Sequence, residues 1–146
     1  MKESIYVGIL KMEEDEFVFR PGNFKIIDSK KLDIQFNFAF DWDLKKGHYT
    51  ISLTVIYKYR FKTLDVELSK FVTTTTFEVK GLEAGPNNEG LGLNIPDFLI
   101  LTFLNVAISS ARGMLVYRLS GTILADFYLP LIDPNEFLSQ IKRPDK

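Results

Sequence analysis

The chain has 146 residues, a length that predicts a single domain spanning residues 1–146. Hydrophobic residues make up 46% and charged residues 25%, a balance that excludes an intrinsically disordered chain. Lysine and arginine number 18 against 19 aspartates and glutamates, so no basic excess exists to collect phosphates, and we expect no nucleic-acid partner. One histidine and no cysteine exclude the commonest zinc sites and thiol chemistry.

The first element is a predicted strand from Ile5 to Phe19. Its apolar run of six residues is shorter than the hydrophobic region of a signal peptide, so we expect a cytoplasmic protein. The acidic run Glu13–Glu16 interrupts the strand, and we interpret it as a solvated turn, with a partner-contact patch as the alternative. Residues 24–29 then form a crossover connection that is apolar for a loop.

Two long alternating segments follow, at residues 32–44 and 49–61, separated by a turn around Gly47. Apolar and polar side chains alternate with period two in both, which predicts an antiparallel hairpin with one aromatic face. A third strand over residues 66–79 changes phase, and this change predicts a β-bulge near Ser69 and Lys70.

The C-terminal part is predicted to be helical. Asn94 and Pro96 begin a helix that runs from about Ile95 to Leu119, where Ser120 and Gly121 end it. Residues 98–117 approach the length of a membrane span, but polar and charged side chains within them favour a buried helix, and we expect no membrane insertion. The helix is apolar nearly all round, so it must be covered on more than one side. A short helix from Asp133 to about Lys142 completes an α+β, two-layer fold with four antiparallel strands.

Candidate catalytic groups are sparse. His48 lies in a predicted turn without evident partners, and Asp41 and Asp43 lie on the polar face of one strand, where a solvated face is the simpler interpretation. The motif Tyr57-Lys58-Tyr59-Arg60 could stack bases, but it equally fits an ordinary alternating strand. We therefore expect no enzyme, no metal and no cofactor, and the abundant apolar surface favours binding over turnover.

The order of these features resembles the SecB family of export chaperones and their SecB-like relatives. The resemblance lies in the hairpin LDIQFNFAFDWDLKKGHYTISLTVIYKYR, the strand end TTFEVKGLE, the helix IPDFLILTFLNVAISSARG and the later segment LPLIDPNEF. It implies an ATP-independent holdase that binds unfolded polypeptides in hydrophobic grooves. It also implies a homotetramer, a dimer of dimers with the long helix in the interface. A non-enzymatic oligomeric scaffold or a small hydrophobic-ligand module is the alternative.

The resemblance also assigns candidate site residues. Eleven apolar side chains would line the peptide-binding groove, although Ile34 and Phe36 fit the core equally well: Phe24, Ile26, Ile27, Ile34, Phe36, Phe71, Phe127, Leu129, Leu131, Phe137 and Ile141. The positions that match the partner-binding acids of the export chaperone are Glu16, Arg20 and Lys70, of which two reverse the charge. These reversals weigh against docking to the SecA translocase. SecB-like chaperones of toxin–antitoxin systems, which protect an antitoxin tail, fit at least as well.

Overall fold

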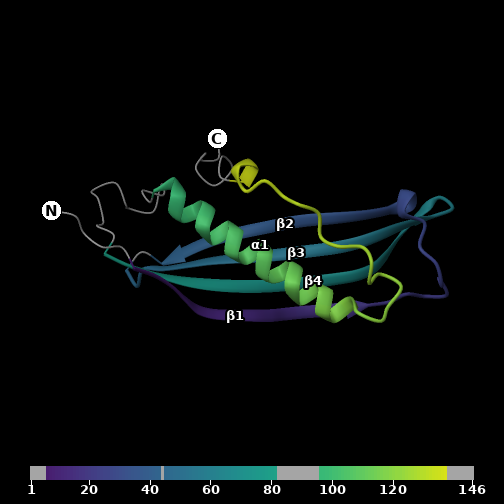
Figure 1. Ribbon diagram of the computed structural model, residues 1–146, viewed down its shortest axis with the longest axis horizontal. Coiled ribbons are helices and arrows are strands. Elements are labelled where there is room, and N and C mark those ends of the chain that lie inside the picture. Colours follow the sequence, from purple (N-terminus) through teal and green to yellow (C-terminus); the bar gives the residue numbers. More distant parts are fainter. Residues whose placement is uncertain (1–5, 44, 82–95, 138–146) are drawn as a thin grey trace.

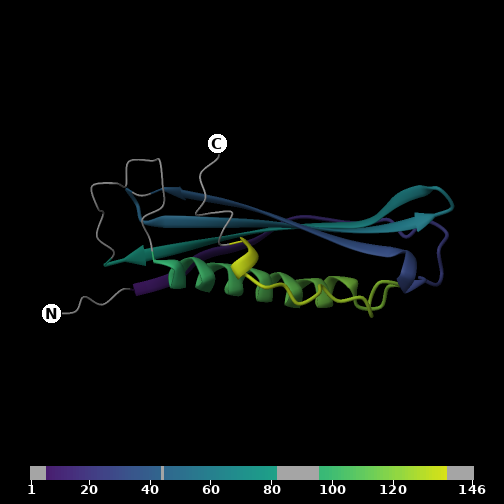
Figure 2. The ribbon, with the colours of Figure 1, turned by 90° about the horizontal axis from the view of Figure 1, so that it is seen from above.

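The computed structural model describes residues 6–43, 45–81 and 96–137. Its elements are the strands β1 (Tyr6–Phe19), β2 (Leu32–Asp43), β3 (His48–Phe61) and β4 (Leu64–Lys80), the 3-10 turn η1 (Ser29–Lys31) and the helix α1 (Asp97–Leu119). The strands form one antiparallel sheet in the order β1-β4-β3-β2 (Figure 1). Helix α1 and the segment after it lie on the same side of this sheet (Figure 2). The predicted α+β, two-layer architecture is confirmed.

The predicted hairpin is present in full, with β2 paired to β3 from Leu32 opposite Tyr59 to Asp43 opposite His48. Side chains alternate as the sequence predicts: every second residue of β3 from Tyr49 to Tyr59 is buried on the helix side. Gly47 closes the turn with φ of +69°, and its carbonyl accepts the backbone N–H of Val79 at 2.9 Å. The turn therefore ties the hairpin to the end of β4.

The predicted bulge lies at Leu68, one residue before the expected position. Tyr57 pairs with Ser69 and Lys58 pairs with Glu67, so Leu68 has no partner on β3. Both Leu68 and Ser69 are buried, because the extra residue lets two neighbouring side chains face inward.

The acidic run Glu13–Glu16 is not the predicted turn. It lies within a continuous β1, where Glu14 pairs with Thr73 and Glu16 with Val72, with a register shift at Asp15. The prediction was wrong because β1 is an edge strand, on which charged side chains reach water without ending the strand.

Helix α1 packs mainly on β3 and β4. The ring of Phe103 stacks between Phe77 and Tyr49, with centroids 4.5 and 5.5 Å away. Burial of each such apolar side chain contributes about 1.5–3 kcal/mol, so this contact anchors the helix to the sheet. The sheet-facing side of α1 consists of Leu99, Ile100, Phe103, Leu104, Ala107, Ile108, Ala111, Leu115 and Leu119.

Among the described residues, the opposite face of α1 carries exposed apolar side chains, so its expected covering on a second side stays a prediction. Phe98, Val116 and Tyr117 are exposed there. The helix has 23 residues with a mean hydropathy of 1.7 in its most apolar window, enough by length and composition to cross a membrane. Core helices of soluble proteins meet the same criterion, and 44% of that window is buried.

The predicted capping residue Asn94 lies outside the described residues, and Asp97 follows Pro96 as the first helical residue. At the other end, Ser120 and Gly121 end the helix as predicted, with Gly121 at φ of +79°. A helical turn is present at residues 135–137, and the rest of the predicted last helix lies outside the described residues.

Candidate functional site

An aromatic stripe runs along the helix-facing side of β2. Because α1 packs mainly on β3 and β4, the stripe keeps partial access to solvent. Its rings contact one another and the core, with Phe40 5.6 Å from Trp42 and 6.4 Å from Tyr49. The stripe consists of five half-buried side chains: Ile34, Phe36, Phe38, Phe40 and Trp42.

One wall beside the stripe is the segment after α1, residues 120–137, which runs back along the helix on the same side of the sheet (Figures 1 and 2). The Tyr57 hydroxyl donates to the Phe127 carbonyl at 2.7 Å. Burial raises the pKa of Tyr57 to about 12, so this hydroxyl stays protonated at neutral pH and can donate. Arg112 of α1 donates to the carbonyls of Leu129 and Pro130 at 3.2 and 2.9 Å.

The far end of this segment covers part of the stripe. The Phe137 ring lies 4.6 Å from the ring of Phe38 and 5.4 Å from that of Phe36. Between the anchored part and Phe137, Leu131 is 92% exposed, and within the anchored part Tyr128 is also exposed. The segment thus offers apolar side chains to solvent next to the stripe.

The crossover connection supplies apolar side chains at the other end of the sheet. The Phe24 ring packs edge-on against Tyr59 and Phe61, with centroids 5.0 and 5.1 Å away. The backbone N–H of Asp28 donates to the Tyr59 hydroxyl at 3.1 Å, which fixes the loop to β3. Ile26 is 83% exposed, so the loop keeps an apolar side chain in water.

These distances and exposures separate the predicted groove residues that are accessible to solvent from those that are buried. Ile26 and Leu131 are largely exposed. Six others are partly accessible and pack against the core: Phe24, Ile27, Ile34, Phe36, Phe127 and Phe137. Their role in peptide binding stays a prediction. Ile141 lies outside the described residues.

Two predicted groove residues belong to the core instead. Phe71 is 0% exposed, because the bulge at Leu68 places it among the residues of β4 that face α1. Leu129 is 3% exposed, because the hydrogen bonds from Arg112 hold its backbone against the helix. Neither side chain can contact a client in this conformation. Sequence reasoning missed Phe38, Phe40 and Trp42, although the same alternation that identified Phe36 places them on one face.

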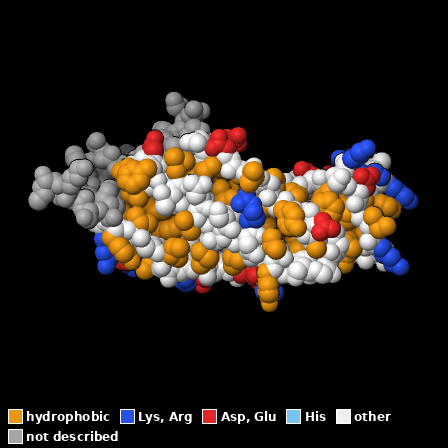
Figure 3. Space-filling view, in the orientation of Figure 1, with side chains coloured by type: hydrophobic (Ala, Val, Ile, Leu, Met, Phe, Trp, Pro, Cys, Tyr) orange, Lys and Arg blue, Asp and Glu red, His pale blue; other side chains and the backbone are white. Residues whose placement is uncertain are grey.

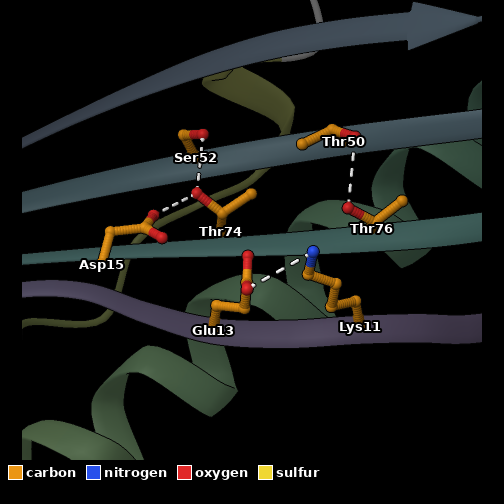
Figure 4. Close-up of polar contacts among 7 residues, drawn as sticks. All are labelled: Lys11, Glu13, Asp15, Thr50, Ser52, Thr74 and Thr76. Carbon is orange, nitrogen blue, oxygen red and sulfur yellow. Dashed lines mark hydrogen bonds and ion pairs between the residues drawn. The ribbon is translucent and has the colours of Figure 1, made fainter.

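The opposite face of the sheet is polar (Figure 4). Hydroxyl groups pair across β3 and β4, with Thr50 3.3 Å from Thr76 and Ser52 3.2 Å from Thr74. Thr74 also donates to Asp15 of the β1 bulge. The surface suited to binding apolar side chains therefore lies mainly on the helix-facing side of the sheet.

The predicted partner-binding residues lie near the end of β1. Glu16 and Lys70 form an ion pair at 3.6 Å, and the backbone N–H of Arg20 donates to the Leu68 carbonyl. Each charge of the pair is thus partly offset by the other. A role in partner binding stays a prediction.

No group of three or more histidine, cysteine, aspartate or glutamate side chains arranged to hold a metal ion occurs in residues 6–43, 45–81 and 96–137.

Comparison with known proteins supports the fold. No protein-family model matches the chain, and no curated protein matches it in sequence. Among solved structures, the SecB-like chaperone Rv1957 of Mycobacterium tuberculosis is similar, with a TM-score of 0.59 and 16% identity over 87% of this chain and 91% of that one. That chaperone was solved in complex with a ChAD peptide from the HigA1 antitoxin. A protein of unknown function from Streptococcus agalactiae also matches, with a TM-score of 0.31 and 10% identity over 91% of this chain and 100% of that one. The likeness to Rv1957 shows that the chain has a SecB-like fold.

Proposed function

We propose that this protein is an ATP-independent holdase that binds non-native polypeptides on the helix-facing side of β2. The observation that carries the proposal is the half-buried aromatic stripe of β2, which α1 leaves partly open. A surface of this kind, flanked by exposed Ile26 and Leu131, is typical of a site for apolar partners. The peptide bound to the SecB-like chaperone of similar fold supports the same kind of client, including an antitoxin.

Binding would come from many weak apolar contacts. Each Å² of apolar surface removed from water contributes roughly 25 cal/mol, so a client of several apolar residues gains affinity without sequence-specific pockets. In the described part of the chain β2 is an edge of the sheet, so an extended client could also pair with its backbone.

The test uses two highly exposed side chains whose replacement leaves the core intact. We expect the double variant Ile26→Asp/Leu131→Asp to lose most of its binding to reduced, carboxymethylated α-lactalbumin, a permanently unfolded protein. It should also lose suppression of aggregation of a heat-denatured model enzyme without ATP. The control is Leu10→Asp, an exposed leucine of β1 at the opposite edge of the sheet, which should bind like the wild type.

Two results would contradict the holdase proposal. One is a wild-type protein that neither binds the unfolded probe nor delays aggregation. The other is tight binding of a fatty acid without peptide binding, which would favour a small hydrophobic-ligand module.

The proposed assembly is an oligomer in which a second copy covers the outer face of α1. This face combines exposed Phe98 and Tyr117 with Gly113, whose lack of a side chain permits a second helix to approach closely. A Cβ atom added at Gly113 meets no atom within 4 Å in the single chain. Gly113→Leu should therefore fold normally and yet disrupt a close contact between two copies of α1.

Sedimentation velocity checks this assembly. We expect the wild type to sediment as an oligomer, with a homotetramer as the state that the resemblance implies, and Gly113→Leu to sediment as a smaller species. A wild-type monomer at micromolar concentration would refute the proposal, and so would a Gly113→Leu variant that keeps the wild-type oligomer.

A further inference from the structure

A basic hollow of about 330 Å³ lies beside the first residues of β2. It is lined by four cationic side chains, Lys30, Lys31, Lys58 and Arg60, and two carboxylates, Asp33 and Asp65. The chain as a whole has a formal charge of −1, so this excess of positive charge is local. Figure 3 shows several lysine and arginine side chains gathered at the corresponding end of the molecule.

Three of these cations form no ion pair among the described residues, although Lys58 lies opposite Asp33 on β2 and Glu67 on β4 in the sheet register. Arg60 is held by Asp65 at 2.7 Å, whereas Lys30, Lys31 and Lys58 make no ion pair within 4.0 Å with any described residue. Asp33 is exposed and accepts a hydrogen bond from Gln35 at 3.1 Å. The lining thus carries two more cations than carboxylates, an excess of positive charge that an anionic group can contact.

The hollow and the aromatic stripe lie on opposite faces of the same edge strand. Along β2, Ile34 and Phe36 face the helix side, whereas Asp33 and Gln35 line the hollow, which Leu32 also borders at the start of the strand. A peptide added to the edge of β2 in extended conformation would alternate in the same way, with side chains on one face repeating every 7 Å or so. Alternate residues of the peptide would therefore contact the aromatic stripe on one face and the basic hollow on the other.

We propose that the first half of β2 binds extended client segments in which apolar and acidic residues alternate, with the acidic residues facing Lys30, Lys31 and Lys58. This inference rests on the proposed client binding and specifies which segments are preferred. A polypeptide fits better than a nucleic acid, because Asp33 and Asp65 on the rim of the hollow would repel a continuous phosphate backbone.

The experiment compares three labelled ten-residue peptides, which alternate valine with glutamate, with glutamine or with lysine. At 50 mM NaCl we expect the glutamate peptide to bind about 5- to 20-fold more tightly than the glutamine peptide, since two or three exposed charge pairs each contribute a few-fold. The preference should shrink toward one at 0.5 M NaCl, where exposed charges are screened over a few Å.

Two variants test the residues. Lys30→Glu/Lys58→Glu should reverse the preference, so that the lysine peptide binds more tightly than the glutamate peptide. Asp33→Asn removes a competing carboxylate and should strengthen binding of the glutamate peptide about two- to threefold. All three substituted side chains are partly or fully exposed, but Lys58→Glu faces Asp33 and Glu67 across the sheet, so circular dichroism checks that each variant keeps the wild-type fold.

The outcomes separate this inference from the holdase proposal. Equal binding of all three peptides would overturn the charge preference, whereas binding of unfolded α-lactalbumin in the same assay would still support the holdase. Failure to bind any of the peptides would also overturn the inference. If a ten-nucleotide oligouridylate competes for the same lysines and binds more tightly than the glutamate peptide, the hollow is a nucleic-acid site and the inference is wrong.

Discussion

The hydrogen bond from Tyr57 to the Phe127 carbonyl gives a prediction with a defined pH dependence. Tyr57→Phe removes the hydroxyl and leaves a part-buried carbonyl without that donor. The ring itself stays fully buried, so the packing of β3 under α1 is preserved. An unsatisfied buried group costs about 1–3 kcal/mol, and we expect the free energy of unfolding at pH 7 to fall by that amount.

The pKa of Tyr57 lies near 12 in the folded protein, above the ordinary value of 10.0. A raised pKa means that folding favours the protonated hydroxyl. Its contribution to stability is therefore complete below pH 10 and is lost as the pH rises towards about 12. A full proton over one pH unit corresponds to about 1.4 kcal/mol, but the unfolded tyrosine is already half deprotonated at pH 10, so the wild type should lose roughly 1 kcal/mol of stability between pH 10 and pH 11 through this group.

Urea unfolding followed by circular dichroism, at one protein concentration and at several pH values from 7 to 11, measures both effects. The wild type should be more stable than Tyr57→Phe at pH 7, and the difference should shrink by about 1.4 kcal/mol at pH 11. A difference that stays constant over this range would refute the role of the protonated hydroxyl in fixing the segment after α1.

Three further substitutions test the structure. Gly47→Ala places a Cβ atom 2.6 Å from the Val79 carbonyl oxygen at a φ of +69°, so it should destabilise the fold by about 1–3 kcal/mol in urea unfolding. Arg112→Ala removes the donor to two carbonyls after the helix and should speed proteolytic cleavage within residues 122–132 while far-ultraviolet circular dichroism stays unchanged. Arg118→Ala removes a bidentate pair with Glu14 and a contact over the Phe17 ring, and the urea midpoint should fall modestly; an unchanged urea midpoint would show that the pair contributes nothing.

The amino-acid sequence determined the elements and most of their order along the chain. Alternation over residues 32–44 and 49–61, broken at Ala39 and Ile56, predicts a hairpin with one apolar face, and the structure contains this hairpin. The phase change near Ser69 located the bulge within one residue, because a single inserted residue must move later side chains to the other face.

Tertiary structure decided which apolar residues are buried and which are accessible. Phe36 and Phe71 look alike in the sequence, but α1 covers β4 and leaves β2 partly open, so only Phe36 reaches the surface. The sequence also did not show that the acidic run of β1 lies within a strand. This became clear only from the position of β1 at the edge of the sheet. The physical reason is that alternation fixes the face of a strand on which a side chain lies, whereas burial depends on which distant segment packs over that face.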